Sequence, residues 1–123
     1  MRSFCGEKTL MRVFIGEADR CNGKPLYQAL VELFRERGLA GATVLKGVMG
    51  FGASSLIHTD SILSLSADLP VVIELVDTRE NIDKVLPELD DMLHGGMITL
   101  EKAHVIHYSR KKKLSQRFSS ASK

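Results

Sequence analysis

The segment Pro70–Val76, PVVIELV, is the stretch from which the fold can be worked out. Its β-branched and apolar residues predict a strand. Successive side chains of a strand point to opposite faces, so Val71, Ile73 and Leu75 form one purely apolar face. Glu74 interrupts the other face. We therefore expect the first face to lie in a core and the second to remain more exposed.

A helix and a further strand are predicted on the C-terminal side of this segment. Asp77 or Thr78 can cap the helix, and Gly95 and Gly96 end it. Its apolar residues recur at helical spacing. They are Ile82, Val85, Leu86, Leu89 and Leu93. Residues 97–108, MITLEKAHVIHY, then supply a strand.

The N-terminal half has the same order of elements. Thr9–Ile15, TLMRVFI, predicts a strand, and Pro25 suits the first turn of the helix that follows. Gly38 ends that helix, and Thr43–Gly47 gives a second strand. The resulting order, βαββαβ, predicts an α+β fold of the ferredoxin-like sandwich type, with a long loop between strands two and three.

Such a fold packs both helices on one face of the sheet. The other face would carry apolar residues around one arginine and one glutamate. The set is Leu10, Arg12, Phe14, Val72, Glu74 and Val76. The two charges can pair across neighbouring strands, but so much apolar surface predicts an oligomer that buries this face. A monomer with a partly wetted face is the alternative.

Composition limits the class of protein. The chain has 123 residues, of which 44% are hydrophobic and 26% charged, and its net charge is +2. We expect one domain, residues 8–109, followed by a basic tail, residues 110–123, that is disordered or touches an anionic membrane surface. Without the tail the chain is close to neutral, so we expect no nucleic-acid partner.

The expected location is cytoplasmic. No apolar run approaches the roughly 20 residues that a membrane-spanning helix needs, and the N-terminal residues lack a signal-like apolar core. Cys5 and Cys21 show neither CxxC spacing nor a disulfide framework.

The stretch Lys46–Gly52, KGVMGFG, is rich in glycine. Glycines expose backbone amides and let an anion approach closely. The spacing fits neither G-x-G-x-x-G nor the Walker pattern, because no Lys-Ser/Thr pair or helix follows. Taken alone, the stretch fits a plain hairpin loop better than a phosphate-binding loop.

Longer segments carry a family resemblance. VFIGEADRCNGKPLYQALVELFRERGLAGATVLKGVMGFG, residues 13–52, and HTDSILSLSADLPVVIELVDT, residues 58–78, closely resemble the PII-like proteins of domain-of-unknown-function family 190. More distantly, the chain is similar to the PII nitrogen-signalling proteins. The resemblance implies a PII-like homotrimer of ferredoxin-like subunits. It also implies that a small adenine nucleotide or a similar anion binds in the clefts between subunits and that a long loop reports the bound state to a partner, such as a membrane transporter.

The resemblance transfers to particular residues. Thr43 matches a threonine that contacts adenine in PII proteins, the stretch Gly50–Gly52 matches the base of their long loop, and Gly95 and Gly96 match a loop that wraps the phosphates. The candidate ligand-binding residues are Thr43, Lys46, Gly47, Met49, Gly50, Phe51, Gly52, Gly95, Gly96 and Met97. This chain departs from the PII pattern by having fewer cations at these places. Lys102, His104 and Arg110 are the nearest, which suggests a ligand with little phosphate charge, such as AMP.

Other chemistry is less well supported, and we expect neither a resident cofactor nor a metal nor an enzymatic activity. His104 and His107 lie three apart on a predicted strand, so they would point to opposite faces and could not share a metal ion. His58 and Asp60 lie with Ser54 in a flexible loop, which is a poor place for a hydrolytic triad. Two alternatives stay open: a metal-tolerance protein like the trimeric copper-tolerance family, and an enzyme acting on a nucleotide. Glu17 and Asp19 are read as solvated loop carboxylates.

Overall fold

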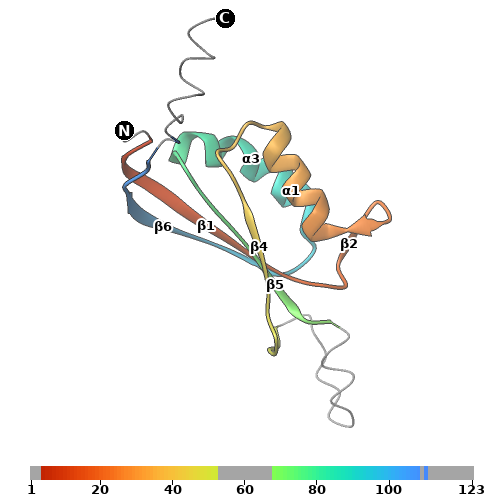
Figure 1. Ribbon diagram of the computed structural model, residues 1–123. Coiled ribbons are helices and arrows are strands. Elements are labelled where there is room, and N and C mark those ends of the chain that lie inside the picture. The colour runs from red at the N-terminus through yellow and green to blue at the C-terminus, as the bar shows by residue number, and fades with distance from the viewer. Residues whose placement is uncertain (1–3, 53–67, 109, 111–123) are drawn as a thin grey trace, which may run out of the picture.

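The computed structural model describes residues 4–52, 68–108 and 110. Its main feature is an antiparallel sheet of four strands in the order β4-β5-β1-β6, with two helices on one side (Figure 1). The strands are β1 (Gly6–Gly16), β4 (Thr43–Lys46), β5 (Pro70–Asp77) and β6 (Met97–Val105), and the helices are α1 (Leu26–Glu36) and α3 (Arg79–Met92). The α+β class is confirmed, and the arrangement is compatible with the ferredoxin-like fold.

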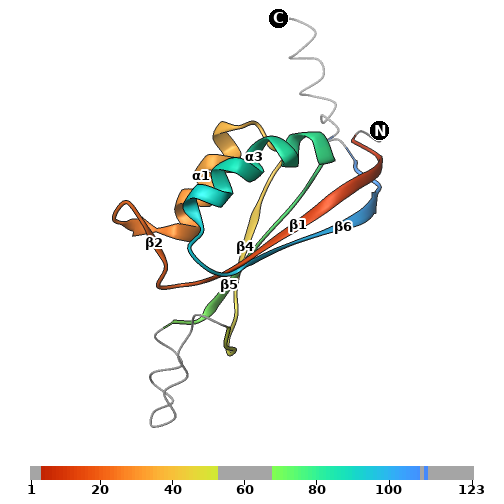
Figure 2. The same cartoon turned by 180° about the vertical axis from the view of Figure 1, so that it is seen from behind.

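The hydrophobic core lies between the helices and one face of the sheet. Figure 2 shows from behind that α1 and α3 run side by side over this face. The predicted apolar faces of β1 and β5 are both buried here, as are the inward residues of both helices. The core consists of Met11, Val13, Ile15, Leu26, Leu30, Leu33, Phe34, Val71, Ile73, Leu75, Ile82, Val85 and Leu89.

The opposite face of the sheet, which we call the open face, has no helix over it among the described residues. The register places Phe14 between Val72 of β5 and Met97 of β6. Arg12 lies opposite Glu74, and its Nε donates to Glu74 Oε2 at 2.7 Å. The predicted cross-strand ion pair is therefore confirmed. Arg12 also pairs with Glu101 of β6, a partner that the sequence did not reveal.

A small hairpin precedes α1, and the sequence analysis did not predict it. Its strands are β2 (Arg20–Cys21) and β3 (Lys24–Pro25). Asn22 and Gly23 have φ values of 51° and 84°, as expected for the central residues of a tight two-residue hairpin turn. Pro25 therefore ends a strand immediately before the helix and does not stand in its first turn.

The start of α3 is fixed by two neighbouring residues with different tasks. Thr78 is the cap, because its Oγ1 accepts a hydrogen bond from the Asn81 amide at 3.1 Å. Asp77 is 2% exposed, and its carboxylate accepts hydrogen bonds from the backbone amides of Ala40 and Thr78 and from the Asn81 side chain. Burial acts to raise the pKa of Asp77, but these hydrogen bonds together outweigh it and hold the pKa below its usual value.

The last strand is shorter than predicted. β6 ends at Val105, so His107 lies beyond the strand and its direction cannot be inferred from strand alternation. Within the predicted tail only Arg110 is among the described residues, and the predicted disorder of residues 111–123 lies outside them. No helix in the described part of the chain is long and apolar enough to cross a membrane.

Candidate functional site

The first glycine segment, residues 46–52, begins at the last residue of β4 and turns against Pro70. The Gly47 amide donates to the Pro70 carbonyl at 2.7 Å. A Cβ added at Gly47 would lie 2.7 Å from Pro70 Cγ, and one added at Gly50 would lie 2.9 Å from the same atom. The proline ring lies so close that only glycine fits at these two positions. This is a structural reason for the two glycines that does not depend on a ligand.

The apolar residues of this segment are unusually exposed. Val48 is 95% exposed, Met49 77% and Phe51 73%. A side chain of this kind normally gains stability by burial, so these three side chains form an exposed apolar patch. Residues 53–61, the part of the predicted long loop that we expected to report the bound state, lie outside the described residues, and they include Ser54, His58 and Asp60.

The second glycine segment, residues 95–97, joins α3 to β6. Gly96 has φ +86°, and a Cβ there would lie 2.2 Å from the Phe14 carbonyl oxygen, so a larger residue does not fit. Met97 is the first residue of β6 and is 53% exposed. Gly95 lines a cavity of about 370 Å³, whose polar side chains come from Asp19, Arg20 and His94.

Arg20 and His94 are basic residues beside Gly95 that were not predicted as part of the site. They come from the hairpin and from the end of α3, so their proximity depends on the packing of two distant segments. The cations that were proposed instead, Lys102 and His104, lie farther along β6, opposite Thr9 and Glu7. The structure therefore does not bring these two residues to the glycine segments.

The two glycine segments lie at the same end of the sheet but on opposite edges. Lys46 of β4 is opposite Val71 of β5, and Met97 of β6 is opposite Phe14 of β1. Two strands separate the edge strands β4 and β6, which puts the edges about 14 Å apart at the usual strand spacing. One chain alone therefore does not form a cleft lined by both segments.

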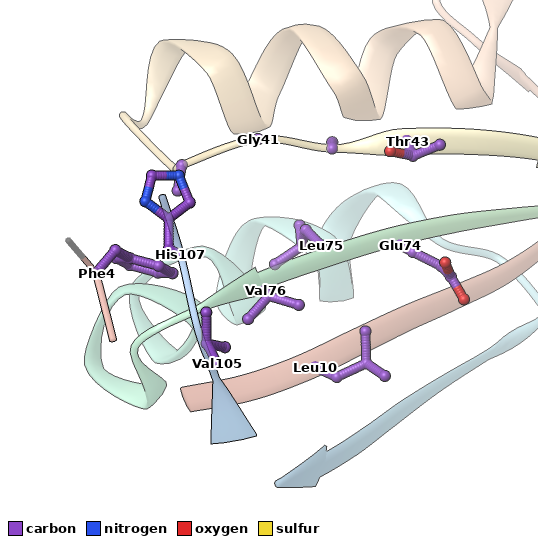
Figure 3. A pocket seen from close by; sticks show the side chains of 11 residues that line it. Phe4, Leu10, Gly41, Thr43, Glu74, Leu75, Val76, Val105 and His107 are labelled. Atoms are coloured by element: carbon purple, nitrogen blue, oxygen red, sulfur yellow. The ribbon is translucent and has the colours of Figure 1, made fainter. Parts of the chain in front are cut away.

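Thr43 lies on the open face, opposite Glu74. It lines a largely apolar cavity of about 560 Å³. Figure 3 shows Phe4 and His107 at one end of this cavity and Thr43 and Glu74 at the other. The remaining side chains drawn there are mostly aliphatic, among them Leu10, Val76 and Val105. Of the residues that line this cavity, only Thr43 was predicted to bind a ligand, although Leu10 and Val76 were expected on this face from the alternation in strands one and three.

Lys46 forms an ion pair with Glu17, which the sequence analysis read as a solvated loop carboxylate. The hydrogen bond to Glu17 raises the pKa of Lys46. The Glu17 amide donates to the Leu69 carbonyl at 2.8 Å, and the Ala18 amide donates to Asp68 Oδ1 at 3.0 Å. The turn after β1 is thus fastened to the residues that precede β5.

Among the described residues, no group of three or more histidine, cysteine or acidic side chains could hold a metal ion.

Comparison with known proteins agrees with the resemblance. The DUF190 family, described as "Uncharacterized ACR", matches residues 8–105. A UPF0166 protein of Aquifex aeolicus is 41% identical over 101 residues, covering 82% of this chain and 95% of the relative. A UPF0166 protein of Methanocaldococcus jannaschii is 36% identical over 97 residues, covering 78% and 89%. A second Aquifex aeolicus UPF0166 protein is 35% identical over 99 residues, covering 80% and 97%.

Proposed function

This chain belongs to the DUF190 family, and from that premise we propose that it is a PII-like regulatory protein. Three copies associate and bind a small adenine nucleotide of the AMP type in the clefts between them. They report the bound state to a partner protein. The protein acts by binding and not by catalysis.

The observation that carries this proposal is the position of the two glycine segments. Glycine-rich backbone is suited to binding an anion, and both segments lie at the same end of the sheet, but they occupy opposite edge strands. In a ring of copies the β4 edge of one subunit meets the β6 edge of the next. Such a ring unites the two segments in one cleft, once at every subunit boundary.

The open face supports the same assembly. Leu45, Val72, Phe14 and Met97 lie in one row across all four strands. Leu45 is 47% exposed and Met97 is 53% exposed, so the row is apolar and poorly covered at both ends. Burial of this row between copies removes apolar surface from water, and the charge of Arg12 on the same face is already compensated by Glu74 and Glu101 of its own chain.

The charges near the segments suit a ligand with little phosphate. Lys46 is the cation of the first segment, and Arg20 and His94 stand beside the second. The negative charge of a triphosphate would need more positive side chains nearby than these residues provide. The apolar cavity beside Thr43 has the chemistry to receive a flat base, and Thr43 itself adds a hydroxyl donor and acceptor.

Binding is tested by calorimetry and thermal unfolding of the full chain with AMP, ADP, ATP and cyclic nucleotides. At a ligand concentration of about 100 times the dissociation constant, the fold should gain about 2.7 kcal/mol. Thr43→Val removes the hydroxyl at nearly constant volume and should weaken binding, whereas Thr99→Val, on the β6 edge, serves as its control. The proposal fails if no nucleotide stabilises the protein. Recovery of a chemically altered nucleotide would instead favour an enzyme.

We propose a membrane transporter as the partner, contacted through the exposed residues at the end of β4. Val48, Met49 and Phe51 are the described residues that present apolar surface there. Crosslinking to a purified transporter should depend on the nucleotide and be lost in Met49→Glu. Crosslinking that is indifferent to both would contradict this assignment.

A further inference from the structure

Lys46 is the only cation in the sequence from Thr43 to Gly52, so it is the natural counter-charge for an anion bound at the first glycine segment. In the structure its ammonium group is paired with the Glu17 carboxylate. The positive charge of Lys46 is therefore already balanced by Glu17 before an anion binds. An anion must share Lys46 with Glu17, and it must also approach the Glu17 carboxylate.

Glu17 is held in this place by the backbone around it. Its own amide and that of Ala18 are bonded to Leu69 and Asp68, while Gly47 is bonded to Pro70. The residues after β1 are thus bonded to Asp68 and Leu69, and the residue after β4 is bonded to Pro70, so Glu17 and Lys46 both stand beside the short segment 68–70. The Glu17 side chain is 27% exposed, against 54% for Lys46, so its charge is the less screened of the two. Its backbone does not need the carboxylate in order to stay in place.

We propose that Glu17 sets the charge selectivity of the ligand site, admitting a monophosphate and disfavouring polyphosphates. This inference rests on the proposed function and adds a residue that determines which phosphate-bearing ligand is preferred. Repulsion between the carboxylate and the ligand grows with the number of phosphate charges, whereas the attraction available from one lysine is fixed. Glu17 therefore determines selectivity, because its carboxylate lowers the affinity for ATP more than the affinity for AMP.

The test compares Glu17→Gln with the wild type by calorimetry against AMP, ADP and ATP without magnesium. Glu32→Gln is the matched control, because Glu32 also pairs with a lysine, Lys24, at 2.7 Å and its replacement changes the net charge equally. Glu17→Gln should bind AMP about threefold to tenfold more tightly, the scale of one partly exposed charge, and the gain should increase from AMP to ADP to ATP. A gain that is equal for the three nucleotides, or no larger than that of Glu32→Gln, overturns the inference.

A second variant tests the other member of the pair. Lys46→Met should lower the affinity for all three nucleotides and lower it most for ATP. This trend is opposite to the one expected for Glu17→Gln. Its thermal midpoint and that of Glu17→Gln should stay close to that of Glu32→Gln, because exposed ion pairs contribute little to stability. A Lys46→Met protein with unchanged affinities would overturn the inference even if Glu17→Gln were poorly folded.

Inorganic phosphate and tripolyphosphate separate this inference from the proposed function. If neither protein binds a nucleotide but Glu17→Gln gains affinity for tripolyphosphate over phosphate, adenine recognition is wrong and the selectivity of Glu17 stands. If the wild type binds AMP and Glu17→Gln shows the same preference among the three nucleotides, the selectivity is wrong and the proposed function stands.

Discussion

The two faces of the sheet are made from alternate residues of the same strands, but they differ in how they are covered. On the helix side, Met11, Val13 and Ile73 are fully buried by α1 and α3. On the open face, Phe14 and Val72 lie in a row that ends in half-exposed Leu45 and Met97. The comparison teaches that the chain folds by closing one face and, in our account, associates by closing the other. Substitutions on the two faces should therefore have different dependences on protein concentration.

The largest effect is expected on the helix side. Phe34 is 1% exposed within the core, so Phe34→Ala removes buried surface and leaves a cavity. Such a change costs about 3–5 kcal/mol of unfolding free energy. Denaturant unfolding should show this loss at every protein concentration. A loss below about 1 kcal/mol would contradict the description of the core.

Asp77 gives the next largest effect, because it ties the chain before β4 to the start of α3 from the helix side. Asp77→Ala leaves the Ala40 and Thr78 amides without this acceptor, at a cost of about 3 kcal/mol. The pKa of Asp77 is held below its unfolded value, so its contribution is present above the unfolded pKa and is lost as pH falls through the folded pKa. The free energy of unfolding should therefore decrease less between neutral and acidic pH for Asp77→Ala than for the wild type. An equal pH dependence in both proteins would contradict this assignment.

Gly96 tests the edge of the open face and should have an intermediate effect. Gly96→Ala introduces a Cβ that would clash with the Phe14 carbonyl, at a residue with φ +86°. Gly23→Ala is the matched control, since Gly23 has φ +84° and no atom within 4 Å of an added Cβ. Backbone strain costs about 1–3 kcal/mol in either case, and only Gly96→Ala adds the clash. If thermal unfolding shows that the two variants lose the same stability, the close contact of Gly96 with β1 has no energetic importance.

The sequence was sufficient to predict the long elements of the fold but not the short ones. Each strand was predicted from the composition and alternation of its own segment, as for Val71, Ile73 and Leu75. The predicted strand order then placed Arg12 and Glu74 on the same face, which was enough to predict their ion pair. The hairpin was missed, because Asn22 and Gly23 stand between strands only two residues long. Periodicity has nothing to detect in so short a strand.

The candidate site could be predicted only in part, for a related reason. Thr43 and the glycines are local signals, and the structure finds a packing reason for several of them. The ion pair of Glu17 with Lys46, and the cavity that Arg20 and His94 both line, bring together residues far apart along the chain. Such neighbours follow from strand order and from the packing of loops, which charge and spacing in the sequence do not specify.

The smallest effect on the isolated fold is expected on the open face. Phe14→Ala removes a side chain outside the core, so the folded single chain should lose little stability. If copies cover this face, the wild type should unfold at a higher temperature as its concentration is raised, and Phe14→Ala should weaken that dependence. A wild-type midpoint that does not change with concentration would contradict burial of the open face.

Trimer formation is tested by the molar mass of the full chain in solution, measured by light scattering at low micromolar concentration. For the wild type we expect the mass of three chains of 13.6 kDa each. We expect the mass of one chain for Phe14→Glu, with an unchanged circular dichroism spectrum, because a carboxylate cannot be buried in the apolar row without a partner. A wild type with the mass of a single chain would contradict the account.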